Sequence, residues 1–199
     1  MARQREFNTD TALDRAVDTF WQQGFEAAGV QALCTAMKLN PGSVYAAFGD
    51  KRALYLAAMD RYIDTVSRDA IERINGASSG GAGIRAYFAN LIDAIVGGKR
   101  RWGCLITNAV AELAQRDPEI ANKIDLHFAR LTTAFEAALV RARCTGELVP
   151  DAGPEKAPFL VCLVQGLNVL AKTRPPRKVL ENIVQTALGA LLKPSQRQQ

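Results

Sequence analysis

The sequence has few of the residues that build disulfide-linked or metal-stabilised domains. Its 199 residues include four cysteines and one histidine. The cysteines are scattered and form no C-x-x-C pair, which argues against a disulfide framework and a structural zinc site. A single histidine cannot build a His-rich metal site, and it disfavours Ser-His-Asp hydrolase chemistry. We therefore expect a protein that needs no metal and no cofactor.

Long apolar runs are also absent. No stretch approaches the ~20 uninterrupted apolar residues of a membrane-spanning helix, and no apolar segment follows the initial Met-Ala-Arg-Gln-Arg-Glu as it would in a signal peptide. The hydrophobic fraction of 48% is nevertheless sufficient for a substantial core. These features predict a cytoplasmic protein without a membrane partner.

Positive charge is present but unevenly placed. The net charge of +5 suits a nucleic-acid partner. Within residues 1–73, however, acidic residues slightly outnumber basic ones, so the excess lies downstream. Any DNA-binding face in this part of the chain must be locally basic within a neutral domain.

Apolar residues recur at helical spacing between glycine and proline positions, which predicts an all-α fold of about nine helices. The Gly- and Ser-rich stretch 75–83 predicts a loop. We expect a three-helix DNA-binding domain over residues 1–52 and a helical ligand-binding and dimerisation domain over 53–199. The expected helices cover 9–23, 30–37, 41–48, 51–74, 84–96, 104–115, 118–144, 154–173 and 177–192.

Two short helices, 30–37 and 41–48, are separated by only three residues. Asn40 is a favourable N-cap, Pro41 suits the first helical position, and Gly42 permits close approach of another backbone. Such a pair is the framework of a helix-turn-helix, in which the second helix enters the major groove of DNA.

The same region resembles the DNA-binding motif of the TetR/AcrR family, without gaps, from Gly24-Phe-Glu-Ala through Pro41-Gly-Ser-Val-Tyr-Ala-Ala-Phe-Gly-Asp-Lys-Arg-Ala-Leu54. It combines the G-[YF]-E-A start, the G-S-[LV]-Y-x-x-F recognition helix and the G-x-K-x-x-L opening of the next helix. The resemblance implies a homodimeric transcription regulator, usually a repressor, that binds a double-stranded DNA operator and responds to a small molecule or an electrophile.

The resemblance also implies roles for individual residues. Tyr45 corresponds to a tyrosine that packs against the DNA backbone, and Lys51 to a lysine that meets a phosphate. Ser43 can hydrogen-bond to a base edge, and Pro41 or Ala46 can touch a thymine methyl group. The predicted DNA contacts are Gln31, Lys38, Pro41, Gly42, Ser43, Tyr45, Ala46 and Lys51.

The sequence departs from the family pattern at three places. Ala28-Gly29 stands where a helix-capping Thr-Ser is frequent, Lys38 where the turn commonly has glycine, and Pro41 where lysine or arginine is common. Because of these departures, the operator sequence cannot be carried over from a relative. Phe48 and Leu54 correspond to core positions of the family motif.

The two helices expected over 154–173 and 177–192 carry wide apolar stripes, which need more cover than one small domain offers. In the family, the last two helices form a four-helix bundle with those of a partner. A twofold dimer would place two recognition helices on half-sites about 34 Å apart. The alternative is that both stripes belong to the chain's own core. The predicted dimerisation residues are Leu163, Leu167, Leu170, Ile183 and Leu188.

The segment Trp102-Gly-Cys-Leu-Ile-Thr-Asn108 resembles one found in a subset of TetR-like repressors, some of which sense electrophiles or oxidants through the cysteine. Cys104 follows Lys99-Arg100-Arg101 and lies at an expected helix N-terminus, and both features favour a reactive thiolate. We therefore predict a sensor site of Trp102, Cys104 and Asn108. The alternative is that Cys104 is a small buried packing residue.

Other functions are also compatible with this sequence. His127 could line a pocket, although a hydrogen-bonded core or surface histidine is the commoner case, and Cys34, Cys144 and Cys162 are expected to pack in the interior. An enzyme would use Cys104 as nucleophile and His127 as base, but no third orienting residue is evident. A transcription activator, or a regulator whose effector is an apolar small molecule without thiol chemistry, would share the same DNA-binding motif.

Overall fold

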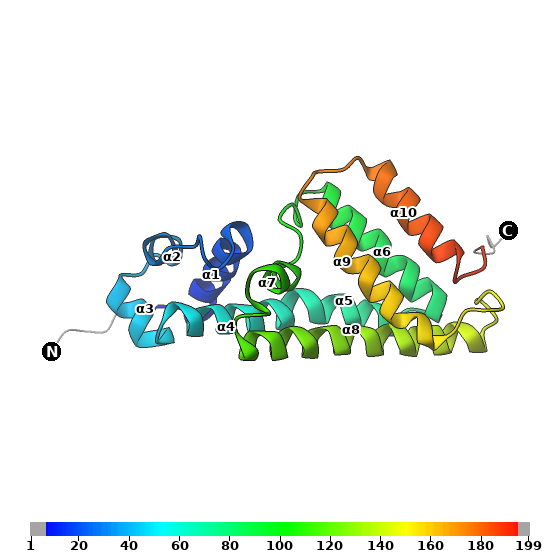
Figure 1. Ribbon diagram of the computed structural model, residues 1–199, viewed down its shortest axis with the longest axis horizontal. Coiled ribbons are helices and arrows are strands. Elements are labelled where there is room, and N and C mark those ends of the chain that lie inside the picture. Colours follow the sequence, from blue (N-terminus) through cyan, green and yellow to red (C-terminus); the bar gives the residue numbers. More distant parts are fainter. Residues whose placement is uncertain (1–6, 195–199) are drawn as a thin grey trace.

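The computed structural model describes residues 7–194 as an elongated, helical molecule (Figure 1). Helices α4 and α5 are joined by a π-helical turn, η1, into one continuous rod, so the described residues contain nine helical rods, as the all-α prediction expected. The elements are α1 (Thr9–Gln23), α2 (Val30–Met37), α3 (Pro41–Phe48), α4 (Lys51–Tyr62), η1 (Ile63–Ser67), α5 (Arg68–Asn75), α6 (Gly80–Val96), α7 (Leu105–Leu113), α8 (Pro118–Cys144), the 3₁₀ turn η2 (Pro154–Lys156), α9 (Ala157–Ala171) and α10 (Arg177–Gly189).

Local capping explains the predicted starts of α1 and α3 and the predicted end of α1. The side chain of Asn8 accepts a hydrogen bond from the backbone N–H of Thr11, and Asn40 does the same for Ser43. Helix α1 ends at Gly24, whose φ of 82° lies in the left-handed region that favours glycine. These signals lie within four residues of the helix ends and can therefore be recognised in the sequence.

The rod from α4 to α5 differs from the uninterrupted helix that the sequence predicts. Its start is capped by Asp50, which accepts a hydrogen bond from the backbone N–H of Ala53. The π-helical turn over Ile63–Ser67 then interrupts the α-helical repeat, with Ser67 buried at its end. Such turns occur frequently at functional sites.

The prediction of a loop over 75–83 is wrong for its second half, because α6 begins at Gly80. A Cβ atom at Gly80 would collide with the carbonyl oxygen of Ala138 on α8, so the glycine allows the two helices to approach closely. Ser79 caps α6 by accepting a hydrogen bond from the N–H of Ala82. Here glycine serves helix packing rather than loop flexibility.

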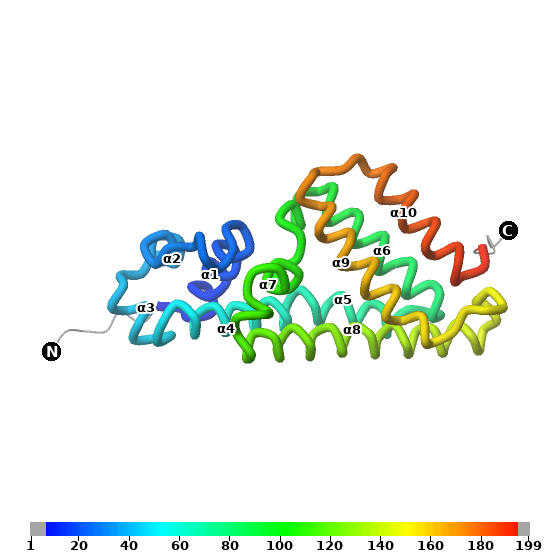
Figure 2. The backbone as a smooth tube through the Cα atoms, viewed as in Figure 1, coloured from blue at the N-terminus to red at the C-terminus, as the bar shows by residue number. Residues whose placement is uncertain are grey.

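Two hydrophobic clusters form the core. The first combines α1 to α4 with α7 and the start of α8, and the second combines α6, the rest of α8, α9 and α10. Helix α5, the second half of the rod from α4 to α5, packs beside α8 (Figure 2). The domain boundary expected after residue 52 thus falls in the first turn of α4, inside this rod. Among the described residues, no helix is long and apolar enough to cross a membrane.

Candidate nucleic-acid interface and effector site

Helix α3 lies at one end of the molecule and is largely exposed (Figure 1). Val44 is its only buried residue, whereas the side chain of Tyr45 is 46% exposed. Ser43 is half-buried, and the remaining predicted contact residues of α2, the turn and α3 are all exposed: Gln31, Lys38, Pro41, Gly42 and Ala46. The structure therefore leaves these residues accessible to a partner, with Ser43 partly covered.

The turn between α2 and α3 has an unusual backbone at Lys38. This residue has φ 59° and ψ 40°, the left-handed conformation, and its N–H donates to the carbonyl oxygen of Thr35. For a non-glycine residue this conformation is less stable by roughly 1–2 kcal/mol. The turn thereby keeps the geometry usually given by glycine while presenting a lysine side chain at the surface.

Lys51, the predicted phosphate contact, lies against the α1–α2 loop. Its Nζ donates a hydrogen bond to the carbonyl oxygen of Glu26 at 3.2 Å and is 4.7 Å from the centroid of the Phe25 ring. The residue is half-buried at the start of α4. A phosphate contact from Lys51 would thus be made by an ammonium group already held close to this loop.

A carboxylate on α7 binds the same loop, a contact that sequence reasoning did not predict. Glu112 accepts hydrogen bonds from the backbone N–H groups of Phe25 at 2.8 Å and Glu26 at 2.7 Å. A Cβ atom at Gly24 would lie 2.9 Å from the Glu112 carboxylate, so glycine there leaves room for the contact. Because the partners are more than 80 positions apart, no local pattern indicates it.

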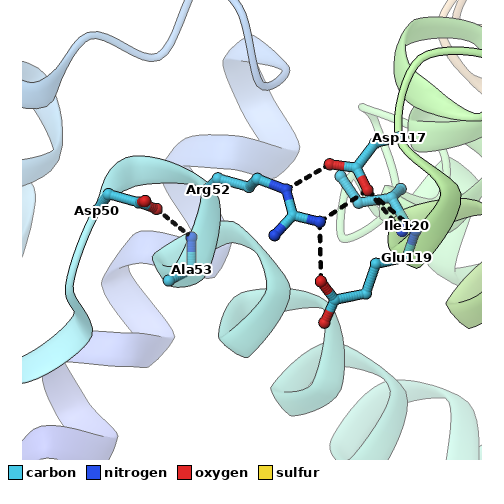
Figure 3. Close-up of polar contacts among 6 residues, drawn as sticks. All are labelled: Asp50, Arg52, Ala53, Asp117, Glu119 and Ile120. Atoms are coloured by element: carbon cyan, nitrogen blue, oxygen red, sulfur yellow. Dashed lines mark hydrogen bonds and ion pairs between the residues drawn. The ribbon is translucent and has the colours of Figure 1, made fainter.

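A second contact joins the start of α4 to the start of α8 (Figure 3). Arg52 donates from Nε to Asp117 at 2.5 Å and from Nη2 to Glu119 at 2.8 Å. Asp117 also caps α8 by accepting from the N–H groups of Glu119 and Ile120. The hydrogen bond from Arg52, together with these N–H groups, lowers the pKa of Asp117 to about 2 despite some opposing desolvation.

Cys104 is buried in a narrow cavity. It is 5% exposed and is the residue immediately before α7, so the predicted position at a helix N-terminus is confirmed. The hydroxyl group of Tyr62 donates to its Sγ at 3.4 Å. The cavity holds about 20 Å³ and is lined by Cys104 together with Ser67, Arg100, His127 and other residues.

His127 lines this cavity and is 6% exposed. Its Nδ1 atom has no hydrogen-bond partner among the described residues. Burial lowers the pKa of His127 to about 4, with further contributions from Arg100 and Arg130, so the imidazole is neutral at pH 7. The prediction of a hydrogen-bonded core or surface histidine is therefore wrong, because the site is buried but offers Nδ1 no partner.

The basic loop before α7 divides its charges between the interior and the surface. The guanidinium of Arg101 lies over the Trp102 ring at 4.2 Å, and Arg101 is exposed. Arg100 is half-buried and donates to Asn168 Oδ1 at 3.2 Å. Within residues 7–194, no carboxylate forms an ion pair with Arg100. Its guanidinium instead faces the cavity that contains the Cys104 thiol.

The predicted grouping of Trp102, Cys104 and Asn108 needs correction. Asn108 Nδ2 donates to the carbonyl oxygen of Trp102 at 3.1 Å, which turns this side chain toward the preceding loop. Trp102 and Asn108 line a separate cleft of about 740 Å³ near Trp21, and neither lines the Cys104 cavity. The structure thus groups Cys104 with Arg100 and His127 instead.

The predicted dimerisation residues also divide into two groups. Leu167 and Leu188 are 1% and 4% exposed and belong to the chain's own core, so assigning them to a partner interface was wrong. Leu163 and Ile183 are half-buried, and Leu170 is 37% exposed. The more exposed apolar side chains of α9 and α10 are Phe159, Val169 and Val179, none of which is among the predicted dimerisation residues.

The other cysteines do not all pack in the interior. Cys34 is buried as expected, but Cys144 and Cys162 are exposed, so the prediction for these two was wrong. Cys162 lies on α9, one turn after Phe159, on the exposed side of the helix. Amphipathic periodicity alone could not separate a side chain turned to the core from one turned to solvent at the edge of the stripe.

Comparison with known proteins shows two matched segments. Residues 12–58 match the family described as bacterial regulatory proteins of the tetR family, and residues 80–187 match the tetracyclin repressor-like C-terminal domain. The chain belongs to the TetR family. It is accordingly a regulatory protein and not an enzyme, and the alternative of a Cys104 nucleophile with a His127 base is set aside.

Curated relatives of this TetR-family chain include two transcription regulators. The HTH-type transcriptional repressor ComR of Escherichia coli is 28% identical over 188 residues, which cover 94% of this chain and 90% of ComR. The HTH-type transcriptional regulator YezE of Bacillus subtilis is 32% identical over 148 residues, covering 74% of this chain and 76% of YezE.

A solved structure resembles nearly the whole chain. The TetR-family regulator CifR, with two cysteines substituted and complexed with 26-base-pair operator DNA, has a TM-score of 0.84 and 32% identity. The match covers 94% of this chain and 99% of CifR. The reduced form of E. coli NemR, with a TM-score of 0.80 and 22% identity, shares the fold.

The two matched segments of this TetR-family protein enclose its candidate sites. All the predicted DNA contacts lie within residues 12–58, and Cys104 and His127 lie within 80–187. Glu112 and Arg52 form contacts that cross from one segment to the other, at 2.7–2.8 Å and 2.5 Å respectively from their partners. The contacts therefore join the part with the helix-turn-helix to the part with the buried cysteine.

Proposed function

We propose that this TetR-family protein is a homodimeric transcription repressor that binds operator DNA through α2, the turn and α3. The observation that carries the proposal is the exposure of α3, which buries only Val44 and leaves Tyr45 and the N-terminal residues of the helix accessible. A helix that is buried only at Val44 and accessible at its N-terminus suits insertion into the major groove.

The chemistry of this surface supports contacts with both phosphates and bases. Tyr45 can donate its phenolic proton to a phosphate, and Lys38 adds positive charge beside the helix. Ser43 and Ala46 are small enough to approach base edges closely. The structure of CifR with operator DNA gives further support, since that protein is 32% identical to this chain over almost its whole length.

A dimer would bring two such surfaces to one operator. Phe159, Val169 and Val179 are 46%, 56% and 45% exposed on α9 and α10, and large apolar side chains gathered in this way mark an interaction surface. Helices α9 and α10 of two copies would form a four-helix bundle of the kind common in helical assemblies. A twofold axis through this bundle would match the symmetry of a palindromic operator.

The contacts of α7 support a route from an effector site to the DNA-binding surface. Helix α7 begins next to Cys104 and, two turns later, carries Glu112, which holds the backbone of Phe25 and Glu26. An effector, or a modified thiol, that shifts the start of α7 would move this loop and change the spacing between two recognition helices. Release from DNA then follows from the lower affinity of the shifted conformation.

A gel-shift titration with DNA that flanks the protein's own coding region tests the proposal. We expect specific binding at moderate salt in the presence of competitor DNA, and a loss of binding for a variant in which both Tyr45 and Ser43 are replaced by alanine. Absence of specific binding to any operator selected from random DNA would contradict the proposal. A promoter fusion measures the sign of regulation, since deletion of a repressor raises expression and deletion of an activator lowers it.

A further inference from the structure

The cleft lined by Trp102 and Asn108 lies at the junction of the two matched segments. This junction cleft holds about 740 Å³, within the roughly 300–1,000 Å³ of small-molecule sites. Its walls are the C-terminal end of α1, the loop before α7, α7 itself and the residues that follow α9. Helix α7 and the end of α9 lie near the middle of the molecule, whereas α3 lies at one end (Figure 1). The junction cleft is therefore separate from the DNA-binding surface.

The junction cleft carries an excess of positive charge. Arg101, Lys172 and Arg174 line it and are exposed, and within residues 7–194 no carboxylate forms an ion pair with any of the three. Glu112 is the one acidic residue among the described residues of the lining, and both its oxygens already accept hydrogen bonds from the α1–α2 loop. Cationic side chains that share a cleft without acidic partners favour the binding of an anion.

The backbone brings these cations together from distant parts of the chain. A Cβ atom at Gly103 would lie 2.5 Å from the carbonyl oxygen of Asn168, so the glycine lets the loop that carries Arg101 approach α9 closely. Arg174 has φ 53°, in the left-handed region, which is less stable by roughly 1–2 kcal/mol for a non-glycine residue. Strained backbone of this kind is frequent at functional sites. Because glycine would be less strained at this position, the presence of arginine favours a role for its side chain.

Two indole rings add an aromatic surface to the junction cleft. Trp21 and Trp102, the two tryptophans of the chain, both line it and are half-buried. Their ring centroids are 6.2 Å apart, and Trp21 Nε1 donates a hydrogen bond to the carbonyl oxygen of Gly103 at 3.1 Å. The guanidinium of Arg101 lies over the Trp102 ring at 4.2 Å. Planar rings pack favourably against indole and guanidinium groups, so this surface suits the aromatic part of a ligand.

We infer that the junction cleft binds a small organic anion in which a carboxylate or phosphate group is attached to an aromatic ring. The oxyanion meets Lys172 and Arg174, and the ring packs beside Trp21 and Trp102. The inference deepens the proposed function and rests on it, because it names the effector class that releases the protein from DNA.

The junction cleft borders the contact by which α7 holds the α1–α2 loop. Gly24 lines the cleft at the end of α1, and Glu112 lines it from α7. The Glu112 carboxylate binds the N–H groups of Phe25 and Glu26, which directly follow Gly24. A ligand between α1 and α7 that binds best to an altered spacing of these helices stabilises that spacing. The helix-turn-helix moves with the loop, and the affinity for the operator falls.

The intrinsic fluorescence of the protein reports on this cleft, because both tryptophans line it. We would titrate the full-length protein with benzoate, phenyl phosphate, neutral benzamide and inorganic phosphate, and repeat each titration by calorimetry. We expect benzoate or phenyl phosphate to bind at least about tenfold more tightly than benzamide, the effect of one charge-assisted contact. The tighter of the two anions distinguishes a carboxylate ligand from a phosphate ligand.

Inorganic phosphate tests the need for the ring, and it should bind at least about tenfold more weakly than the tighter aromatic anion. Inorganic phosphate that binds as tightly as that anion would overturn the inference. Benzamide that binds as tightly, or binding of neither aromatic anion, would also overturn it.

A charge variant and a matched control locate the ligand. Trp21 also lines the neighbouring cleft of about 600 Å³, whereas Lys172 and Arg174 line the junction cleft and not that one. Lys172→Gln combined with Arg174→Gln should weaken anion binding at least about tenfold. The thermal unfolding temperature should not change, because both side chains are exposed. The control is Arg130→Gln, since Arg130 is an exposed arginine of α8 that lines a different groove. Equal anion affinity of the double variant and the control would overturn the inference.

Operator binding measured on the same samples separates this inference from the proposed function. The anion should weaken operator binding by the wild-type protein and not by the double variant. If the protein binds its operator but no aromatic anion, the junction site is wrong and the proposed function stands. If the anion binds but no operator is bound, the proposed function is wrong and the site stands alone.

Two further outcomes of the same measurement would count against the inference. An anion that occupies the cleft without changing operator affinity would overturn its role as effector. If no anion binds while the double variant loses operator affinity, Lys172 and Arg174 contact DNA and the ligand site is wrong.

Discussion

The molecule has two exposed surfaces of opposite character, one at each end (Figure 1). The surface at α2 and α3 consists of small or polar side chains around a single exposed aromatic residue, Tyr45. The surface at α9 and α10 exposes large apolar side chains, including Phe159 and Val169. The first suits a polar, charged partner such as DNA, and the second suits burial by another copy of the chain. The contrast indicates that neither surface is complete in one isolated chain.

The largest effect is expected from disrupting the apolar surface. Val169→Glu places a charge in the proposed dimer interface, which should yield monomers and weaken operator binding at least about 100-fold, because one recognition helix is lost from the complex. Analytical ultracentrifugation and gel shifts would measure both. Leu126→Glu on α8, where the native side chain is 52% exposed, is the matched control and should remain dimeric. A dimeric Val169→Glu protein would refute the assignment of this interface.

The next largest effect concerns the contact between α7 and the α1–α2 loop. Glu112→Ala removes the acceptor of two charge-assisted hydrogen bonds, which should destabilise the fold by about 2–3 kcal/mol and increase hydrogen exchange at the Phe25 and Glu26 amides. Urea unfolding and amide exchange would measure this. The matched control is Glu119→Ala, because Glu119 is 56% exposed and should contribute less than about 1 kcal/mol. Unchanged exchange at both amides would show that Glu112 does not hold the loop.

A smaller effect is expected when the hydroxyl group of Tyr45 is removed from the DNA-binding surface. Tyr45→Phe removes the phenolic hydroxyl of a side chain that is 46% exposed. Operator affinity should fall about 5- to 10-fold, the loss of one hydrogen bond to a phosphate, while the thermal unfolding temperature should not change. Fluorescence anisotropy with labelled operator would measure the affinity. A large loss of stability would instead place Tyr45 in the core.

His127 should make the stability of the fold depend on pH. The folded protein holds the pKa of His127 at about 4, below the ordinary value of 6.5, so the unfolded chain binds a proton over this interval and the folded protein does not. Stability should therefore fall as pH decreases through this window, by at most about 1.4 kcal/mol per pH unit from this group. Urea unfolding at pH 7.5 and pH 5.0 should show a smaller decrease for His127→Gln, which has no titrating imidazole. Equal decreases would mean that His127 is not buried in its neutral form.

The same two regions differ in how much of them the sequence could predict. The starts of α1 and α3 follow from caps at Asn8 and Asn40, and the end of α1 follows from Gly24, all of which act within a few residues. The contacts of Glu112, the inward turn of Arg100 and the burial of Leu167 depend on packing between distant segments. Helical periodicity identifies an apolar stripe, but it does not tell which of its edges the rest of the chain covers.

The cavity at Cys104 shows the same limit. The position of Cys104 before α7 and its closeness to the basic loop were predicted from local pattern, but the approach of His127 was not. Asn108 follows one turn later on α7, yet its side chain is drawn to the carbonyl oxygen of Trp102, while His127 arrives from α8. A spacing of one helical turn places two residues on similar faces without fixing what either side chain binds.

Footprinting of the operator complex tests the central claim most directly. Hydroxyl-radical cleavage of bound DNA, combined with the mass of the complex from sedimentation, would show how many chains bind and where. We predict at least two chains on one site, with two protected segments related by a twofold axis and about 34 Å apart along the helix. A single chain that protects one segment, or protection without any symmetry, would contradict a dimer that reads DNA through two copies of α3.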